Sequence, residues 1–224
     1  MTDFPFAVIG FDLDGTLVDS NRDIFPAINH ALKLAGRDPV SIDATRELIG
    51  GGARMMFMRA TALAGDPASD EEIEHLNQNF MDYYQDHIAD NTIPFEGCLT
   101  ALDMLAERSC TLAVVTNKAE SSARKLLDKL GMTDRFASII GGDTLGADRA
   151  KPAPDMIFET IKRCDKPGRF AMIGDSTYDS RAATAAGVPS IIVSFGYNDA
   201  PRNEIGATRV IDHYDELIPA LEAL

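Results

Sequence analysis

The chain begins with a short segment, residues 6–11, that is apolar throughout and shows no alternation with polar residues. Continuous hydrophobicity over so few residues is typical of a parallel strand that is buried on both faces. Similar segments recur later in the chain, at residues 111–115, 138–140, 170–173 and 190–193. Segments with helical spacing of apolar residues lie between them, at residues 98–108, 119–131, 153–164 and 178–186. This alternation predicts an α/β fold with a doubly wound, mostly parallel sheet.

Residues 20–91 interrupt the alternation. This region contains no convincing strand, and glycines separate its helical segments, which we expect at residues 21–35, 41–49, 53–64 and 70–88. We interpret the region as a helical cap inserted after the first strand. The predicted domains are therefore an α/β core formed by residues 1–19 and 92–224, and a cap formed by residues 20–91. The alternative is that these helices pack on the sheet as ordinary layers.

Composition narrows the classes of function. The formal net charge of the 224 residues is −14, and nucleic-acid binding normally needs a basic surface, so we expect no nucleic-acid partner. No apolar run approaches the roughly 20 residues that span a bilayer, so we expect no membrane partner. The first residues lack the pattern of a secretory signal, and the expected location is the cytoplasm. A protein this acidic needs local positive charge to bind an anion.

Polar side chains follow three of the predicted strands, at the edge where open α/β sheets bind their ligands. They are Asp12 and Asp14 after the first strand, Thr116, Asn117 and Lys118 after the second, and Asp175 and Asp179 after residues 170–173. Lys151 precedes a predicted helix and adds a positive charge. Clustered carboxylates repel one another unless a cation neutralises them, and Mg²⁺ accepts such ligands together with water and phosphate. Each aspartate alone is also compatible with a turn or a helix cap.

Gly15 and Thr116 have properties that fit phosphate binding. Gly15 permits a sharp turn that brings backbone N–H groups close to an anion. Thr116 lies where the next helix is expected to open, so its hydroxyl can donate to phosphate beside the helix dipole. It is equally suited to be the N-cap of that helix.

Four segments together resemble the motifs of the haloacid dehalogenase (HAD) superfamily. They are residues 12–20, Thr116, Lys151 with Pro152, and residues 174–179, which occur in the order of those motifs. The resemblance implies a Rossmann-like core, and the long insert after the first motif resembles the helical cap of members that act on small molecules.

The resemblance also implies roles. Asp12 is expected to attack phosphorus and become an aspartyl phosphate, and Asp14 to act as general acid and then base. Mg²⁺ is expected to bind the carboxylates of Asp12 and Asp175 and the main-chain carbonyl of Asp14, while Asp179 orients the ligands or Lys151.

The phosphoryl group is expected to meet a second set of residues. Thr116 and the N–H of Asn117 would hold its oxygens, with the turn at Gly15 beside them. Lys151 would pair with the phosphate and with Asp12.

Substrate choice is expected to come from the cap. Gly50–Gly52 allow close approach of the backbone to a ligand, and Arg54 has a planar fork that suits a carboxylate. A simple turn followed by a solvated arginine is the alternative. Lys118 either faces the substrate or is exposed. Tyr197 and Asn198 either line the same edge or close a loop.

Several of these details resemble the phosphoglycolate phosphatase branch of the superfamily. The matching segments are residues 51–54, 114–118, 141–143 and 195–198. The implied substrate is 2-phosphoglycolate, a small-molecule phosphate monoester. Other phosphates (a sugar phosphate, a muramic acid phosphate or pyrophosphate), a phosphomutase and a non-catalytic binding module remain alternatives. A dehalogenase is disfavoured because it needs no residue with the role of Asp14. The sequence leaves open whether the protein is a monomer or a homodimer.

Overall fold

A parallel sheet forms the centre of the molecule. The structure, a computed structural model, describes residues 4–224. The strand order is β5-β4-β1-β6-β7-β8, and neighbouring strands are parallel throughout. The strands are β1 (Val8–Phe11), β4 (Thr111–Val115), β5 (Ser138–Ile140), β6 (Phe170–Gly174), β7 (Ser190–Val193) and β8 (Arg209–Ile211). The predicted α/β class with a doubly wound parallel sheet is confirmed.

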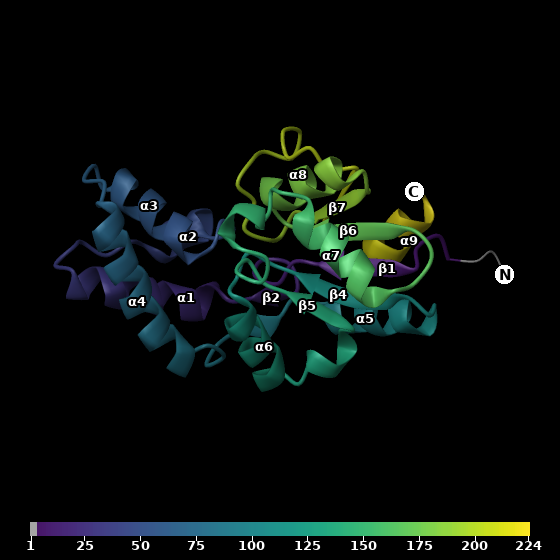
Figure 1. Cartoon of the computed structure of the whole chain (residues 1–224), viewed down its shortest axis with the longest axis horizontal. Coiled ribbons are helices and arrows are strands. Elements are labelled where there is room, and N and C mark those ends of the chain that lie inside the picture. The colour runs from purple at the N-terminus through teal and green to yellow at the C-terminus, as the bar shows by residue number, and fades with distance from the viewer. Residues whose placement is uncertain (1–3) are drawn as a thin grey trace.

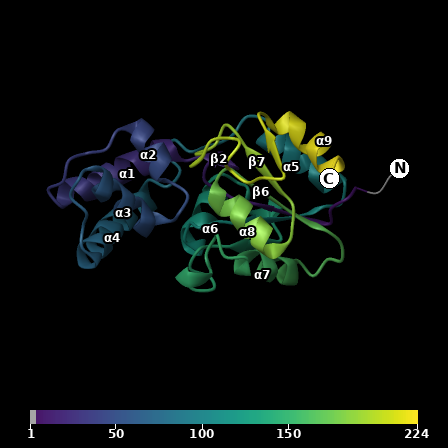
Figure 2. The ribbon, with the colours of Figure 1, turned by 90° about the horizontal axis from the view of Figure 1, so that it is seen from above.

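Helices cover both faces of this sheet (Figure 2). On one face lie α5 (Cys98–Glu107), α6 (Glu120–Lys129) and α9 (Leu217–Glu222), and on the other lie α7 (Asp155–Cys164) and α8 (Thr177–Ala186). Successive strand residues point to opposite faces, so Ile9 belongs to the apolar cluster of the first group and Val8 to that of the second. Burial on both faces explains why the strands read as continuous apolar runs.

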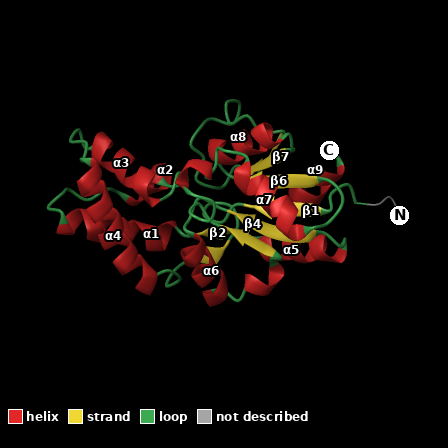
Figure 3. Ribbon diagram, in the orientation of Figure 1, coloured by secondary structure: helices red, strands yellow, loops and turns green. Residues whose placement is uncertain are grey.

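The region from residue 20 to residue 91 contributes helices that lie beyond one end of the sheet instead of on its faces (Figures 1 and 3). They are α1 (Asn21–Leu34), α2 (Ile42–Leu48), α3 (Ala53–Leu63) and α4 (Asp70–Asp86). The helix starts follow local capping chemistry. Ser41 accepts a hydrogen bond from the N–H of Ala44, and Ser69 accepts one from the N–H of Glu72. We refer to α1–α4 as the cap, with the proposed boundaries of residues 20–91.

A two-stranded antiparallel ribbon lies where the chain leaves the sheet and where it returns. Its strands are β2 (Val18–Asp19) and β3 (Ile93–Pro94). The sequence predicted no ribbon here, because two residues are too few to show a strand pattern. The ribbon brings the two proposed ends of the cap together.

Other short elements also escaped prediction. These are β8, α9 and the 3₁₀ turns Thr133–Arg135, Ala147–Arg149 and Tyr214–Glu216. Arg209 is exposed on the edge strand, which weakens the apolar signal there. The predicted helices have boundaries that differ from the observed ones by up to two residues. Within residues 4–224, no helix combines the length and the apolar character needed to cross a bilayer.

A buried carboxylate fastens the returning chain to the cap. Asp23 lies in α1 and accepts hydrogen bonds from the backbone N–H groups of Asn91 and Thr92, at 2.9 and 2.8 Å. The Thr92 hydroxyl and the Asn91 side-chain amide also donate to it, at 2.6 and 2.9 Å. This one carboxylate therefore satisfies four donors at the junction.

We expect Asp23→Ala to lower the free energy of unfolding by about 2–4 kcal/mol, because it leaves buried donors without an acceptor. Urea denaturation measures this change. Asp38→Ala, at an exposed position beyond the end of α1, is the matched control and should change stability by less than about 0.5 kcal/mol. Equal effects of the two substitutions would contradict the role given to Asp23.

Candidate active site

A cavity of about 550 Å³ lies between the carboxyl ends of the strands and the cap. Asp12 follows β1 and Thr116 follows β4, and both line it. The cap contributes the backbone of Gly50–Gly52 and apolar side chains that include Met56 and Phe80. Both parts of the chain therefore line the cavity, with the polar residues of the strand ends on its floor.

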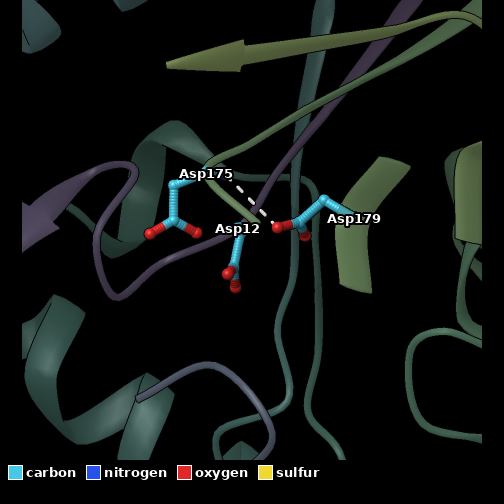
Figure 4. A group of neighbouring side chains, drawn as sticks. All are labelled: Asp12, Asp175 and Asp179. Atoms are coloured by element: carbon cyan, nitrogen blue, oxygen red, sulfur yellow. Dashed lines mark hydrogen bonds between the residues drawn. The ribbon is translucent and has the colours of Figure 1, made fainter. Parts of the chain in front are cut away.

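Three aspartates converge beside this cavity. Asp12, Asp175 and Asp179 are all buried, and one carboxylate oxygen from each lies within 4.8 Å of the other two. Figure 4 shows the carboxylates of Asp12 and Asp175 directed toward a common space, with Asp179 beside them. Sequence reasoning predicted this cluster from strand ends that are more than 150 residues apart in the chain.

Lys151 supplies the nearest positive charge. Its Nζ lies 3.0 Å from Asp12 Oδ1 and donates hydrogen bonds to Asp179 Oδ1 at 2.6 Å and to the carbonyl oxygen of Val115 at 2.8 Å. The ammonium is buried, and these three acceptors satisfy its donors. Lys151 thus fixes the orientation of the Asp12 carboxylate.

The cluster carries more negative charge than Lys151 can neutralise. Burial raises the pKa of Asp12 to about 6, although the attraction of Lys151 opposes the rise. Burial, followed by repulsion from Asp179 and Asp12, raises the pKa of Asp175 well above its usual value. Three buried carboxylates and one ammonium leave an excess of two negative charges when all are ionised. A divalent cation fits this donor set in charge and in chemistry.

Asp179 is already committed to other partners. Its Oδ2 accepts hydrogen bonds from the N–H groups of Asp175 and Ser176, and from the Ser176 hydroxyl, while its Oδ1 binds Lys151. The Ser176 and Asp179 contacts form a capping box at the start of α8. Asp12 and Asp175 are therefore the carboxylates best placed to hold a metal ion, and Asp179 positions them and Lys151.

The loop after β7 holds Asp175 from the other side. The N–H of Tyr197 donates to Asp175 Oδ2 at 2.6 Å, and the side-chain amide of Asn198 donates to the Asp175 carbonyl at 2.5 Å. A side chain at Gly15 would lie 2.0 Å from Asp175, so only glycine fits there. Tyr197 and Asn198 thus lie at the strand-end edge and hold Asp175 there, which agrees with the first of the two positions considered for them.

Asp14 lies in a different environment from Asp12. It accepts a hydrogen bond from Ser20 Oγ at 2.6 Å and forms an ion pair with Lys118 Nζ at 3.1 Å. Lys118 in turn donates to the phenol oxygen of Tyr84, on α4, at 2.8 Å. The alternative of an exposed Lys118 is wrong, since its side chain is only 8% exposed.

Tyr84 is one of two adjacent tyrosines on α4, Tyr83 and Tyr84, and the sequence alone does not show which of them faces the cavity. Tyr84 is buried and stacks on Phe80, whereas Tyr83 stacks between two histidines. Helical spacing from Phe80 was the one signal that could have singled out Tyr84 as the inward residue.

The segment after β4 is a loop, whereas the sequence predicted that Thr116 would lie at the opening of the next helix. Thr116 is not the N-cap of the next helix, because α6 begins at Glu120 and Ala119 occupies the cap position. Asp143 accepts the hydrogen bond of the Glu120 N–H at 2.8 Å, so it supports this helix start. Thr116 Oγ1 accepts the N–H of Lys118 at 3.2 Å and lines the cavity. The site therefore uses a loop, instead of a helix terminus, at this strand end.

Asn117 links the core to the cap. Its side-chain amide donates to the carbonyl oxygens of Gly50, at 3.0 Å, and Lys151, at 2.9 Å. Gly52 has a positive φ of 83°, and a side chain there would lie 3.3 Å from the Asn117 carbonyl oxygen. The glycine turn thus lies close against the strand-end loop, whereas the predicted close approach of its backbone to a ligand stays a prediction.

Arg54 lines the same cavity but has partners of its own. Its guanidinium donates to Asp70 at 2.6 Å and lies 4.0 Å from Glu74, both on α4. The side chain is 49% exposed. A substrate would have to draw Arg54 away from this ion pair in order to bind it.

Comparison with known proteins decides the family. Residues 9–193 match the family model described as haloacid dehalogenase-like hydrolase. The chain belongs to this family. The resemblance drawn from the four motifs is confirmed.

Relatives extend the match over nearly the whole chain. A phosphoglycolate phosphatase of Agrobacterium fabrum is 41% identical over 99% of this chain and 95% of its own length. Another, of Caulobacter vibrioides, is 38% identical over 95% of this chain and 89% of its own length. A crystal structure from Haemophilus somnus, described as a predicted phosphoglycolate phosphatase, superposes with a TM-score of 0.87 at 28% identity. That superposition covers 96% of this chain and 98% of the other.

The raised pKa of Asp12 has a measurable consequence for stability. With divalent ions removed, Asp12→Asn should gain stability relative to the wild type as the pH rises from about 4 to about 6. In this window the unfolded aspartate loses its proton while the buried one keeps it, so the wild type binds more protons when folded and becomes less stable as the pH rises. The advantage of the variant should stay constant above about pH 6. Urea denaturation across pH tests this, and a difference that does not vary with pH would contradict the burial argument.

Proposed function

We propose that this protein hydrolyses a small phosphate monoester through an aspartyl phosphate formed on Asp12. The observation that carries the proposal is the position of Asp12 on the floor of the cavity, 3.0 Å from Lys151 and beside Asp175. An attacking carboxylate, a fixed ammonium and a second carboxylate for a cation are the components that phosphoryl transfer uses.

In the first step, an oxygen of Asp12 attacks phosphorus and the bond from phosphorus to the ester oxygen breaks. Asp14 donates a proton to the leaving oxygen, so the alcohol departs neutral. In the second step, Asp14 accepts a proton from water as the water oxygen attacks the phosphoryl group. Inorganic phosphate leaves and Asp12 is regenerated. Ser20 supports this role because it holds the Asp14 carboxylate at the cavity.

Asp12 and Asp175, with the main-chain carbonyl of Asp14, would hold Mg²⁺. When bound, the ion offsets negative charge on the phosphoryl oxygens and on the carboxylate cluster. Lys151 orients Asp12, and Asp179 keeps Lys151 in place. These roles are consistent with the excess negative charge of the cluster.

The other site residues divide by the part of the substrate that they would meet. Thr116, the N–H of Asn117 and the turn at Gly15 would contact the phosphoryl oxygens. The leaving group would face the cap and the upper cavity, where Gly52, Arg54 and Lys118 lie.

We propose 2-phosphoglycolate as the substrate. The names of the relatives support this choice, and so do two cations at the cavity, Arg54 and Lys118, that can meet a carboxylate. A sugar phosphate, a muramic acid phosphate or pyrophosphate is the alternative, as is transfer of the phosphoryl group within a sugar phosphate by a mutase.

Phosphate release tests the proposal. We expect the wild type to release inorganic phosphate from 2-phosphoglycolate with a higher kcat/KM than from glucose 6-phosphate or pyrophosphate. Asp12→Asn should lower kcat by roughly 10³-fold or more, because no nucleophile remains. Asp128→Asn, at an exposed position on α6, is the matched control and should retain activity. Full activity of Asp12→Asn would refute the nucleophile, and interconversion of glucose phosphates without phosphate release would indicate a mutase.

Removal of divalent cations tests the metal. Treatment with EDTA should abolish phosphate release, and excess Mg²⁺ should restore it, because the cluster otherwise repels the phosphoryl group. Asp175→Asn should raise the Mg²⁺ concentration needed for half-maximal activity, and isothermal titration should detect weaker Mg²⁺ binding by this variant. Undiminished activity in EDTA would exclude the proposed requirement.

A further inference from the structure

A tyrosine of the cap and a lysine of the core meet inside the cavity. Tyr84 lies on α4 and Lys118 follows β4, and the lysine Nζ donates to the tyrosine oxygen at 2.8 Å. Both side chains line the cavity, although Tyr84 is only 1% exposed and Lys118 only 8%. The pair is thus buried and belongs to the wall of the active site.

The hydrogen bonds of this pair are incomplete. The Tyr84 oxygen accepts from Lys118, but within residues 4–224 its O–H group donates to no acceptor. Burial raises the pKa of Tyr84 to about 12, so the phenol keeps its proton at neutral pH. Lys118 is the cation of the pair, and its Nζ also forms an ion pair with Asp14 at 3.1 Å. A neutral donor and a cation therefore face the cavity together, and an anion is their complementary ligand.

The position of the pair relative to the reaction limits what that anion can be. Asp14 is the proposed proton donor to the leaving oxygen, so the leaving oxygen lies beside Asp14. Lys118 Nζ lies 3.1 Å from the same carboxylate. An anionic group bound by Lys118 must therefore be close to the leaving oxygen along the substrate. In 2-phosphoglycolate the carboxyl carbon is two bonds from that oxygen.

Arg54 is a weaker candidate for the same anion. It is occupied by Asp70 at 2.6 Å, and its side chain is half exposed. Water and salt screen an exposed cation more strongly than a buried one. Binding a substrate through Arg54 would cost its ion pair with Asp70, and binding through Lys118 would weaken its ion pair with Asp14. Only the second subsite, however, adds a donor without an acceptor, the Tyr84 hydroxyl.

We propose that Tyr84 and Lys118 together form the subsite that binds the carboxylate of a short substrate, and that Tyr84 is the specificity-determining residue contributed by the cap. This inference rests on the proposed phosphatase function. On binding, the substrate carboxylate accepts hydrogen bonds from the Tyr84 hydroxyl and the Lys118 ammonium, and so takes Lys118 partly away from Asp14. Because one member comes from the cap and the other from the core, the subsite is complete only when the two lie together.

The test compares two substrates that differ in the charge of the leaving group, 2-phosphoglycolate and ethyl phosphate. Tyr84→Phe removes only the hydroxyl and keeps the ring that stacks on Phe80. We expect it to lower the ratio of kcat/KM for 2-phosphoglycolate to that for ethyl phosphate by about tenfold or more, mainly through a higher KM. Loss of one hydrogen bond to a charged group weakens binding by a factor of this order. Tyr83→Phe, at a half-buried position on the same helix that does not line the cavity, is the matched control and should leave the ratio unchanged. Thermal unfolding should verify that both variants are folded.

Three results would overturn the inference. The first is an unchanged ratio in Tyr84→Phe, and the second is an equal fall of the ratio in Tyr83→Phe. The third is a larger fall in Arg54→Ala than in Tyr84→Phe. Each would show that Tyr84 is not the residue that selects for the substrate carboxylate. Failure of the proposed function looks different, because the wild type itself would then release phosphate from neither substrate or would show no preference for 2-phosphoglycolate.

Discussion

The ammonium group of Lys151 lies between two buried carboxylates, and the rest of the site depends on this charge compensation. Charges taken out of water carry a desolvation cost of several kcal/mol each unless they are paired and hydrogen-bonded. Lys151 pairs with Asp12 and Asp179 and also binds the carbonyl of Val115. Removing it would leave the carboxylates unpaired. The same contacts tie the end of β4, the end of β1 and the start of α8 to one point.

The cap supplies no nucleophile, but it completes the site by covering the cavity in which the proposed reaction takes place. Polar contacts hold it against the strand ends. The main ones join Asn117 to the Gly50 carbonyl, Arg59 to the Tyr178 hydroxyl, and Arg46 to the Phe195 and Gly196 carbonyls. Its apolar side chains cover the cavity, which limits water around the proposed phosphoryl intermediate. A chain of formal charge −14 thus concentrates a few cations in one sheltered place, where the proposed anionic substrate would bind.

Local patterns accounted for most of the fold. The apolar runs of β4, β5 and β7 were predicted to the residue, since parallel strands buried on both faces leave a clear signal. The ribbon of β2 and β3, the edge strand β8 and the short α9 were missed, because short or half-exposed elements have no pattern of their own. Thr116 was wrongly considered as a helix N-cap, since the sequence does not show where a loop ends and α6 begins.

The sequence alone determined which chemistry is available. The aspartates and the glycine turn follow recognisable strands, and Lys151 precedes a predicted helix. Because parallel strands place their carboxyl ends at one edge, these residues could be proposed together as the reacting groups. Only the tertiary structure decided which cation faces which anion. Arg54, which the sequence suggested as the carboxylate ligand, pairs with Asp70, whereas Lys118 reaches Asp14 and Tyr84 inside the cavity. These choices depend on how α4 packs against the loop after β4, and contacts between such distant segments leave no trace in local periodicity.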